Sequence, residues 1–142
     1  MPSVFTLIIN GDLPGHFLWS DDKCVAFLSI NPITDGHALI VPRVEVDQWT
    51  DLDADLAAHL MTVAHHVGNA QKAVFEPTRI GQMIAGFEVP HTHVHVIAID
   101  DMGDMSFANA AATVDHAELA SQAERLREAL TSAGHQGVSD AP

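Results

Sequence analysis

The chain has 142 residues, with 19 Asp and Glu against 6 Lys and Arg, so its formal net charge is −13. This length is that of one domain, and 47% hydrophobic residues suffice for a packed core, which excludes a disordered chain. The acidic surface repels phosphate backbones, so we expect no nucleic-acid polymer as a partner.

The two ends of the chain and its single cysteine set further limits. Cys24 alone forms no internal disulfide and no cysteine-based zinc knuckle, and it fits a reducing compartment. The N-terminal segment is not basic, and the longest apolar runs are far shorter than the about 20 residues that span a membrane. We therefore predict a cytoplasmic protein without a signal peptide or a membrane partner. Residues 1–133 are predicted to form one domain, and the small, polar residues 134–142 a frayed tail.

The first half of the chain reads as strands and turns. Residues 24–30 (CVAFLSI) predict a strand, and Asn31-Pro32 with Asp35-Gly36 predict turns. Residues 37–41 (HALIV) predict a second strand that ends at Pro42. Two strands joined by about six residues favour an antiparallel hairpin.

The second half begins with the clearest helix, predicted from Thr50 to about Phe75. Leucines and valines recur there at three- and four-residue spacing, Thr50 with Asp53 resembles a capping box, and Pro77 follows the end. Residues 79–85 and 91–99 predict two more strands, and residues 115–131 a second amphipathic helix. Strands before and after one long helix, rather than in alternation with helices, predict an α+β fold.

Three alternating histidines, His91, His93 and His95, carry the chemistry of the sequence. Side chains alternate along a strand, so the three imidazoles are expected on one face, about 6.5–7 Å apart. Burying each ring costs free energy unless it is hydrogen-bonded, so the cluster indicates a function rather than packing. Two chemistries stay open here, a metal ion on three imidazoles or covalent and acid–base chemistry at phosphorus.

The same segment resembles a known signature. Residues 91–97 (HTHVHVI) are similar to the His-x-His-x-His-x-x pattern, with apolar x, of the histidine triad (HIT) family of nucleotide hydrolases and transferases. Residues 27–32 (FLSINP) and 36–43 (GHALIVPR) resemble its F-x-D-I-x-P and G-H-x-L-V-I-P-K block. The resemblance runs from Ser3 to Ile99. It implies a five-stranded, mainly antiparallel sheet with one long helix and a C-terminal helix, and a homodimer joined through the long helix and the adjacent strand.

The resemblance also implies a role for each histidine. His93 matches the residue that attacks the α-phosphorus of a nucleotide to form a nucleotidyl-histidine intermediate, which water then hydrolyses. His95 matches the residue that contacts the phosphate, His91 an orienting residue, and His37 the upstream member of the same cluster. A neutral imidazole, with an ordinary pKa of about 6.5, is nucleophilic at neutral pH, and this mechanism needs no metal or other cofactor.

Several positions depart from the family pattern. Ser29 stands where the family has an Asp that grips the ribose hydroxyls, Phe87 where it has Gln, and Glu88 where Ser or Thr is common. With these three, the predicted substrate-binding residues are Leu28, Ile30 and Asn31. Leu28 and Ile30 either line an apolar base slot or belong to the core. Structural-zinc ligands of many bacterial members are replaced by Ser3, Thr6 and Glu45, so no zinc is predicted there.

The favoured function is cleavage of a nucleoside phosphoramidate or dinucleoside polyphosphate at the α-phosphorus. The alternatives are a nucleotide- or partner-binding protein with vestigial catalysis and a metal-dependent enzyme that uses the three strand histidines. Outside this site, His59, His65 and His66 are expected on a solvated or dimer-facing surface of the long helix, and Cys24 as a packed thiol.

Overall fold

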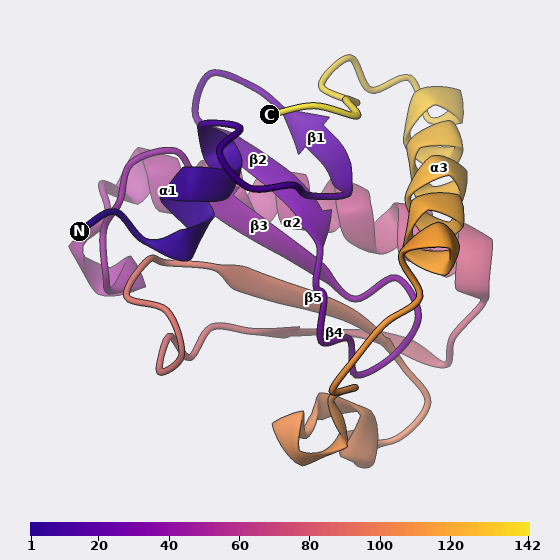
Figure 1. Ribbon diagram of the computed structural model, residues 1–142. Helices are drawn as coiled ribbons and strands as arrows, with labels where there is room; N and C mark the ends of the chain where they lie inside the picture. The colour runs from indigo at the N-terminus through magenta and orange to yellow at the C-terminus, as the bar shows by residue number, and fades with distance from the viewer.

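Five strands form one antiparallel sheet at the centre of the computed structural model, which describes residues 1–142 (Figure 1). The strands are β1 (Phe17–Ser20), β2 (Cys24–Leu28), β3 (Ala38–Pro42), β4 (Arg79–Met83) and β5 (Val94–Ile99). Their order across the sheet is β1-β2-β3-β5-β4, and each neighbouring pair is antiparallel. The predicted α+β fold with a five-stranded antiparallel sheet is confirmed.

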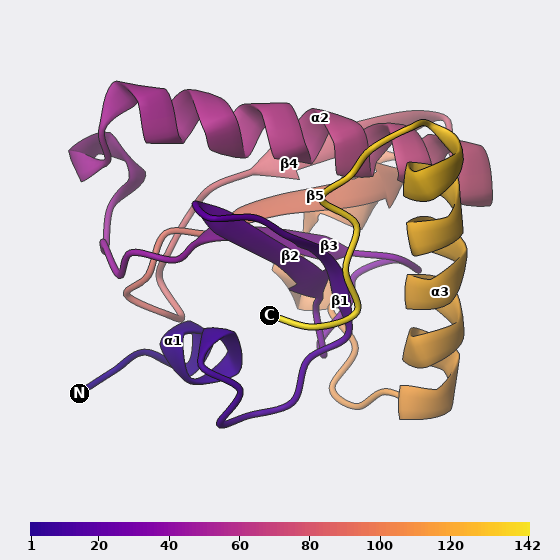
Figure 2. The same ribbon diagram turned by 90° about the horizontal axis from the view of Figure 1, so that it is seen from above.

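Helices cover both faces of this sheet (Figure 2). α1 (Val4–Ile9) lies on one face, α2 (Ala54–Phe75) runs along the other, and α3 (His116–Ser132) packs against α2 and β1. The loops contain three short 3-10 helices, η1 (Trp49–Asp51), η2 (Met102–Met105) and η3 (Phe107–Asn109). None of the helices combines the length and the apolar character that crossing a lipid bilayer requires.

Each face of the sheet carries its own apolar cluster, because successive side chains of a strand point to opposite sides. The larger cluster lies under α2 and includes alternate residues of β2, namely Cys24, Ala26 and Leu28. The smaller cluster contains Phe27 and Leu39 together with Phe5 of α1. His95 of β5 is paired with Leu39 across the ladder, so its side chain lies on the α1 face.

The two long helices match their predicted ranges closely, with a difference at the start of α2. Residues 49–51 form the turn η1 instead of the first helical turn, and the side chain of Asp53 makes no capping hydrogen bond, so the predicted capping box does not form. Glu76, in the left-handed conformation, ends α2 directly before Pro77. α1 and β1 were not predicted.

The tail that the sequence predicts to fray is instead paired with β1. The backbone N–H of Ser20 donates to the carbonyl of Gly137 at 2.9 Å, and that of Ser139 donates to the carbonyl of Leu18 at 3.1 Å. Trp19 lies directly over Gly137, where a Cβ would overlap its ring. Residues up to Ser139 therefore pack on the edge of the sheet, because β1 would otherwise leave that edge unpaired.

Gly36, in the turn that leads into β3, is held on both sides by buried glutamines. Its N–H donates to Oε1 of Gln122 at 2.9 Å, and its carbonyl accepts from Nε2 of Gln71 at 2.9 Å. Its φ of +76° is in the left-handed region, and a Cβ there would overlap the ring of Phe75. We expect Gly36→Ala to lower the free energy of unfolding by about 3 kcal/mol or more, as measured by urea denaturation.

Gly11 is the matched control for this substitution. Its φ of +82° is equally unfavourable for alanine, but nothing lies within 4 Å of the added Cβ. Gly11→Ala should therefore cost only about 1 kcal/mol. Equal losses in the two variants would contradict the close packing of Gly36 against Phe75.

Candidate active site

Four predicted histidines meet on the α1 face of the sheet. His95 lies in β5, His91 and His93 in the segment that enters β5, and His37 directly before β3. All four side chains are buried. The ring centroids of His93 and His95 are 4.9 Å apart, and those of His37 and His95 are 5.1 Å apart. The fold thus brings together the residues that the sequence predicted to be catalytic.

Only His95 lies within β5, whereas the sequence predicted one strand through all three triad histidines. β5 begins at Val94, so His91 and His93 precede the first residue of the ladder. Between them, the backbone N–H of Thr92 donates to the carbonyl of Val46, in the loop after β3, at 2.7 Å. Their rings nevertheless lie on the α1 side, because both contact the ring of Phe5, at centroid distances of 5.9 and 4.9 Å. The prediction of a common face therefore holds, and the prediction of a strand through His91 and His93 is wrong.

A chain of hydrogen bonds determines which nitrogen of His37 and His95 carries the proton. The N–H of Ile33 donates to Nδ1 of His37 at 3.0 Å, so neutral His37 has its proton on Nε2. That group donates to Nδ1 of His95 at 2.9 Å, so neutral His95 has its proton on Nε2 as well. Nε2 of His95 is buried and has no partner within the protein. An unpaired buried donor costs about 1–3 kcal/mol, which a ligand oxygen would recover by accepting the bond.

Burial keeps both of these rings neutral. Loss of hydration, reinforced by the neighbouring histidines, lowers the pKa of His37 to about 3. Loss of hydration, reinforced by His93, lowers the pKa of His95 to about 4, although the Glu88 carboxylate acts in the opposite direction. At neutral pH the proton positions given above therefore hold.

His93 is oriented through its Nδ1 nitrogen. Its Nδ1–H donates to the carbonyl of His91 at 2.7 Å, so the neutral ring carries a lone pair on Nε2. His91 is held at both nitrogens, because Nε2–H donates to the carbonyl of Pro42 at 2.8 Å and Nδ1 accepts from the hydroxyl of Ser3 at 2.7 Å. A nitrogen lone pair beside the free N–H of His95 suits nucleophilic attack at phosphorus.

Ser3, Thr6 and Glu45 form a hydrogen-bonded cluster next to His91. The N–H of Ser3 and the hydroxyl of Thr6 both donate to Oε1 of Glu45, at 2.6 and 2.7 Å. These two bonds lower the pKa of Glu45 to about 2. The cluster ties α1 to the loop after β3 and helps to orient His91. That no zinc binds at these positions stays a prediction.

Two of the predicted substrate-binding residues have other roles in the structure. Leu28 is buried in the cluster under α2, on the opposite face of β2 from the histidines, so its assignment to the substrate site is wrong. The side-chain amide of Asn31 donates to the carbonyls of Ala111 and Ala112, at 3.0 and 3.4 Å. Asn31 thus holds the segment after η3 in place, and its amide donors are already used.

The other four lie at or near the surface. Ser29 is half-buried, and its hydroxyl accepts from the backbone N–H of Asn31 at 3.1 Å. Ile30 and Phe87 are exposed apolar side chains, with Phe87 96% exposed. Glu88 is exposed and close enough to His95 to act on its pKa.

Two phenylalanines cover the rings of His93 and His95, and the sequence did not single them out. Phe5 of α1 packs on His93 and Phe107 of η3 packs on His95, each with ring centroids 4.9 Å apart. Only 2% of His93 and 6% of His95 is exposed. Access to the free N–H of His95 therefore requires that a covering side chain moves. Ser3 is a typical N-cap residue and could have indicated the short helix that carries Phe5. No sequence pattern around Phe107 indicates that it packs on His95.

The HIT domain family matches residues 10–102, about two thirds of the chain. An uncharacterized HIT-like protein of Borreliella burgdorferi is 36% identical over 101 residues, which cover 66% of this chain and 73% of that protein. A HIT family member from Bacillus subtilis superposes with a TM-score of 0.68 at 27% identity, covering 83% of this chain and 85% of that one. A zinc-bound histidine triad family protein from Mycobacterium smegmatis superposes with a TM-score of 0.77 at 24% identity, covering 92% and 94%. The chain therefore belongs to the HIT family, whose superfamily comprises nucleotide-binding hydrolases and transferases.

Proposed function

We propose that the protein cleaves a nucleoside phosphoramidate or a dinucleoside polyphosphate at the α-phosphorus through a nucleotidyl intermediate on His93. The observation that carries this proposal is the pairing of two imidazoles whose hydrogen bonds leave complementary nitrogens free. Nε2 of His93 offers a lone pair, and Nε2 of the adjacent His95 offers an N–H without a partner. A nucleophile and a donor for the developing negative charge thus lie side by side.

In the first step, Nε2 of His93 forms a bond to the α-phosphorus, and the bond from phosphorus to the leaving group breaks; a departing amine takes up protons from solvent. The free N–H of His95 donates to a non-bridging oxygen, while His37 holds His95 in the tautomer that can donate. The carbonyl of His91 accepts from Nδ1 of His93 and stabilises the positive charge that the ring acquires. In the second step, water attacks phosphorus and gives a proton to solvent, the bond to His93 breaks to restore the neutral ring, and the nucleoside monophosphate leaves.

Charge favours the phosphoramidate over the polyphosphate. The chain has a net charge of −13, and Glu88 adds a carboxylate close to His95. Further phosphates on the leaving group would be repelled, whereas a leaving amine becomes a cation that a carboxylate attracts. We assign Ser29 to the ribose and the exposed Ile30 and Phe87 to the base or the leaving group.

The proposal includes a homodimer joined through α2 and β4. β4 is the last strand of the sheet, so one side of its backbone has no strand neighbour. Met61 of α2 is 55% exposed and accepts from Nε2 of Gln82 of β4 at 3.3 Å, so the two elements share one surface. An open edge next to exposed apolar area is typical of an interface.

Intact-protein mass spectrometry tests the intermediate. We expect that mixing the protein with adenosine 5′-phosphoramidate, followed by an alkaline quench that preserves the P–N bond, adds one adenylyl group that maps to His93. Native mass spectrometry of the protein without the quench tests the homodimer and should show the mass of two chains. Product formation with an adduct on another residue, or with no adduct at any time point, contradicts the proposed mechanism. AMP binding without any cleavage would instead support the binding protein with vestigial catalysis.

A further inference from the structure

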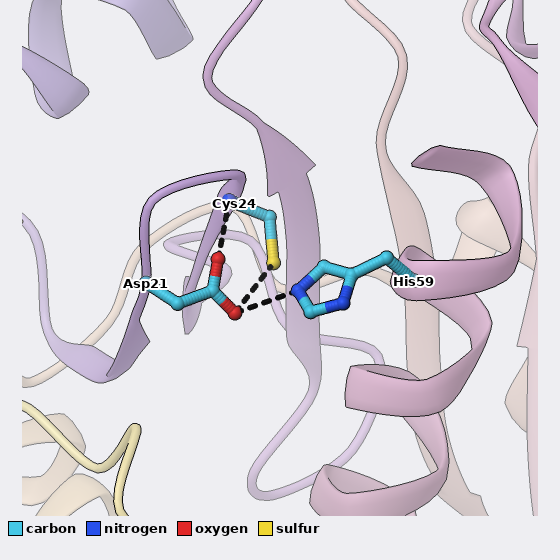
Figure 3. Close-up of side chains that lie close together, drawn as sticks. All are labelled: Asp21, Cys24 and His59. Atoms are coloured by element: carbon cyan, nitrogen blue, oxygen red, sulfur yellow. Dashed lines mark hydrogen bonds and ion pairs between the residues drawn. The ribbon is translucent and has the colours of Figure 1, made fainter. Parts of the chain in front are cut away.

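A second group of side chains that can bind a metal ion lies on the α2 face of the sheet (Figure 3). Asp21 comes from the turn between β1 and β2, Cys24 is the first residue of β2, and His59 lies on α2. One carboxylate oxygen, the sulfur and one ring nitrogen all lie within 4.8 Å of one another. None of the three residues takes part in the proposed reaction.

We propose that Asp21, Cys24 and His59 form a binding site for a divalent cation of the zinc class. Thiolate and imidazole are ligands that zinc prefers, whereas magnesium and calcium take oxygen ligands, so the sulfur selects against them. The carboxylate and the thiolate together carry two negative charges, which balance those of the cation. The site is independent of the triad, because it lies on the other face of the sheet.

The distances suit a tetrahedral ion after a small adjustment. At tetrahedral angles, zinc bonds of about 2.0–2.2 Å to oxygen and nitrogen separate those atoms by about 3.3–3.5 Å, and a bond of about 2.3 Å to sulfur places it about 3.5–3.7 Å from either. In the structure, Sγ of Cys24 is 3.8 Å from Oδ2 of Asp21, and Nε2 of His59 is 2.7 Å from the same oxygen. The His59 ring and the carboxylate need to separate by about 0.7 Å to admit the ion between them. The hydrogen that they now share leaves this position at the same time.

The carboxylate is already held in place by other groups. Its Oδ1 accepts from the backbone N–H groups of Lys23 and Cys24, both at 2.8 Å, and its Oδ2 accepts from Nε1 of Trp19 at 2.8 Å. Burial opposes ionisation, yet these hydrogen bonds outweigh it and lower the pKa of Asp21 to about 2. Such outer partners orient the ligands in metal sites, so Asp21 is preorganised as a ligand.

Cys24 becomes a ligand by losing its proton. Burial and the charge of Asp21 raise the pKa of its thiol, so the metal-free protein carries an S–H group. A divalent cation deprotonates a thiol that binds it, so the thiol proton goes to solvent and an S–metal bond forms. His59 binds through Nε2: the hydrogen that Nε2 donates to Asp21 in the metal-free protein goes to solvent, and the neutral metal-bound ring carries its proton on Nδ1. No oxidant or reductant is required.

The site is open on one side. The side chains of Asp21 and His59 are 20% and 27% exposed, so the ion enters from solvent and a water molecule completes its coordination. The bound ion would link the β1–β2 turn to α2. We therefore expect it to raise the melting temperature, because a ligand that binds only the folded state stabilises that state.

Cobalt and zinc titrations of the full-length, chelator-treated protein test this inference. We expect one equivalent of Co²⁺ to bind, with a near-ultraviolet thiolate-to-cobalt band and visible bands of four-coordinate cobalt, and Zn²⁺ to displace it. Cys24→Ser should abolish the thiolate band, and His59→Gln should weaken binding at least about tenfold. His65→Gln, which changes an exposed histidine on the same helix, is the matched control and should bind as the wild type does.

Three results would overturn the site. They are no stoichiometric binding by the wild type, binding by His59→Gln as tight as the wild type, and a thiolate band that persists in Cys24→Ser. His59 is a partly exposed helical residue, so its variant keeps the test informative even if a Cys24 variant fails to fold, which circular dichroism shows. Binding that is lost in His95→Gln but kept in His59→Gln would place the ion at the triad instead. Turnover of adenosine 5′-phosphoramidate by His59→Gln is measured separately, because His59 takes no part in the proposed reaction. A failure of the metal site is thereby distinguished from a failure of the proposed reaction.

Discussion

Replacing His93 with alanine is expected to lower kcat for adenosine 5′-phosphoramidate by at least about 1,000-fold. Nε2 of His93 is the one nitrogen of the cluster that is left with a free lone pair, and its ring is adjacent to that of His95. The side chains that we assign to the phosphate and the nucleoside are unchanged in this variant. AMP should therefore bind within a few-fold of the wild-type affinity, as measured by calorimetry.

Two further variants make the result specific. His93→Gln keeps most of the side-chain volume against Phe5, so it separates the loss of the nucleophile from the loss of packing. His65→Ala removes an exposed histidine from α2 and should leave kcat unchanged. Turnover by both His93 variants within tenfold of the wild type would exclude His93 as the nucleophile.

The parts of the fold that the sequence predicted are those with enough residues to show a period. α2 and α3 repeat their apolar positions over several turns, and β2 and β3 are continuous apolar runs. α1 and β1 were missed because 6 and 4 residues are too few for any period to stand out. The triad was placed on one face correctly although most of it precedes β5. Extended backbone alternates its side chains whether or not it pairs in a ladder.

The sequence predicted which histidines make up the site but not how their hydrogen bonds arrange them. The four histidines follow from local patterns, but their tautomers depend on partners remote in sequence, such as Ile33 and Pro42. Leu28 was assigned to the substrate site because an apolar strand residue suits a pocket and a core equally well until its face is known. His59 was expected at a solvated or dimer-facing surface, and only the packing of α2 on the sheet brings it to Asp21.

Acid is expected to destabilise the protein strongly below pH 6.5, because two histidines are buried as neutral rings. The pKa values of His37 and His95 are about 3 and about 4 in the folded protein, against about 6.5 in the unfolded chain. Between these pKa values, the unfolded chain therefore binds protons at histidines that stay unprotonated in the folded protein. The free energy of unfolding has its full value above pH 6.5. Below it, each such histidine removes about 1.4 kcal/mol per pH unit until the folded pKa is reached.

Urea denaturation at steps between pH 7 and 5 measures this loss, and the variant His37→Gln identifies its source. The carboxylates of Asp21 and Glu45 also lose stabilising interactions in acid, but only below their ordinary pKa values of 3.8 and 4.5. Burial also lowers the pKa of His91, which adds a loss of the same sign, so the test is the difference between two slopes. His37→Gln should reduce the slope by about one proton, whereas His65→Gln should not change it. Equal slopes for His37→Gln and the wild type would mean that His37 takes up its proton in the folded protein, and the proton assignment of His95 that depends on it would then fail.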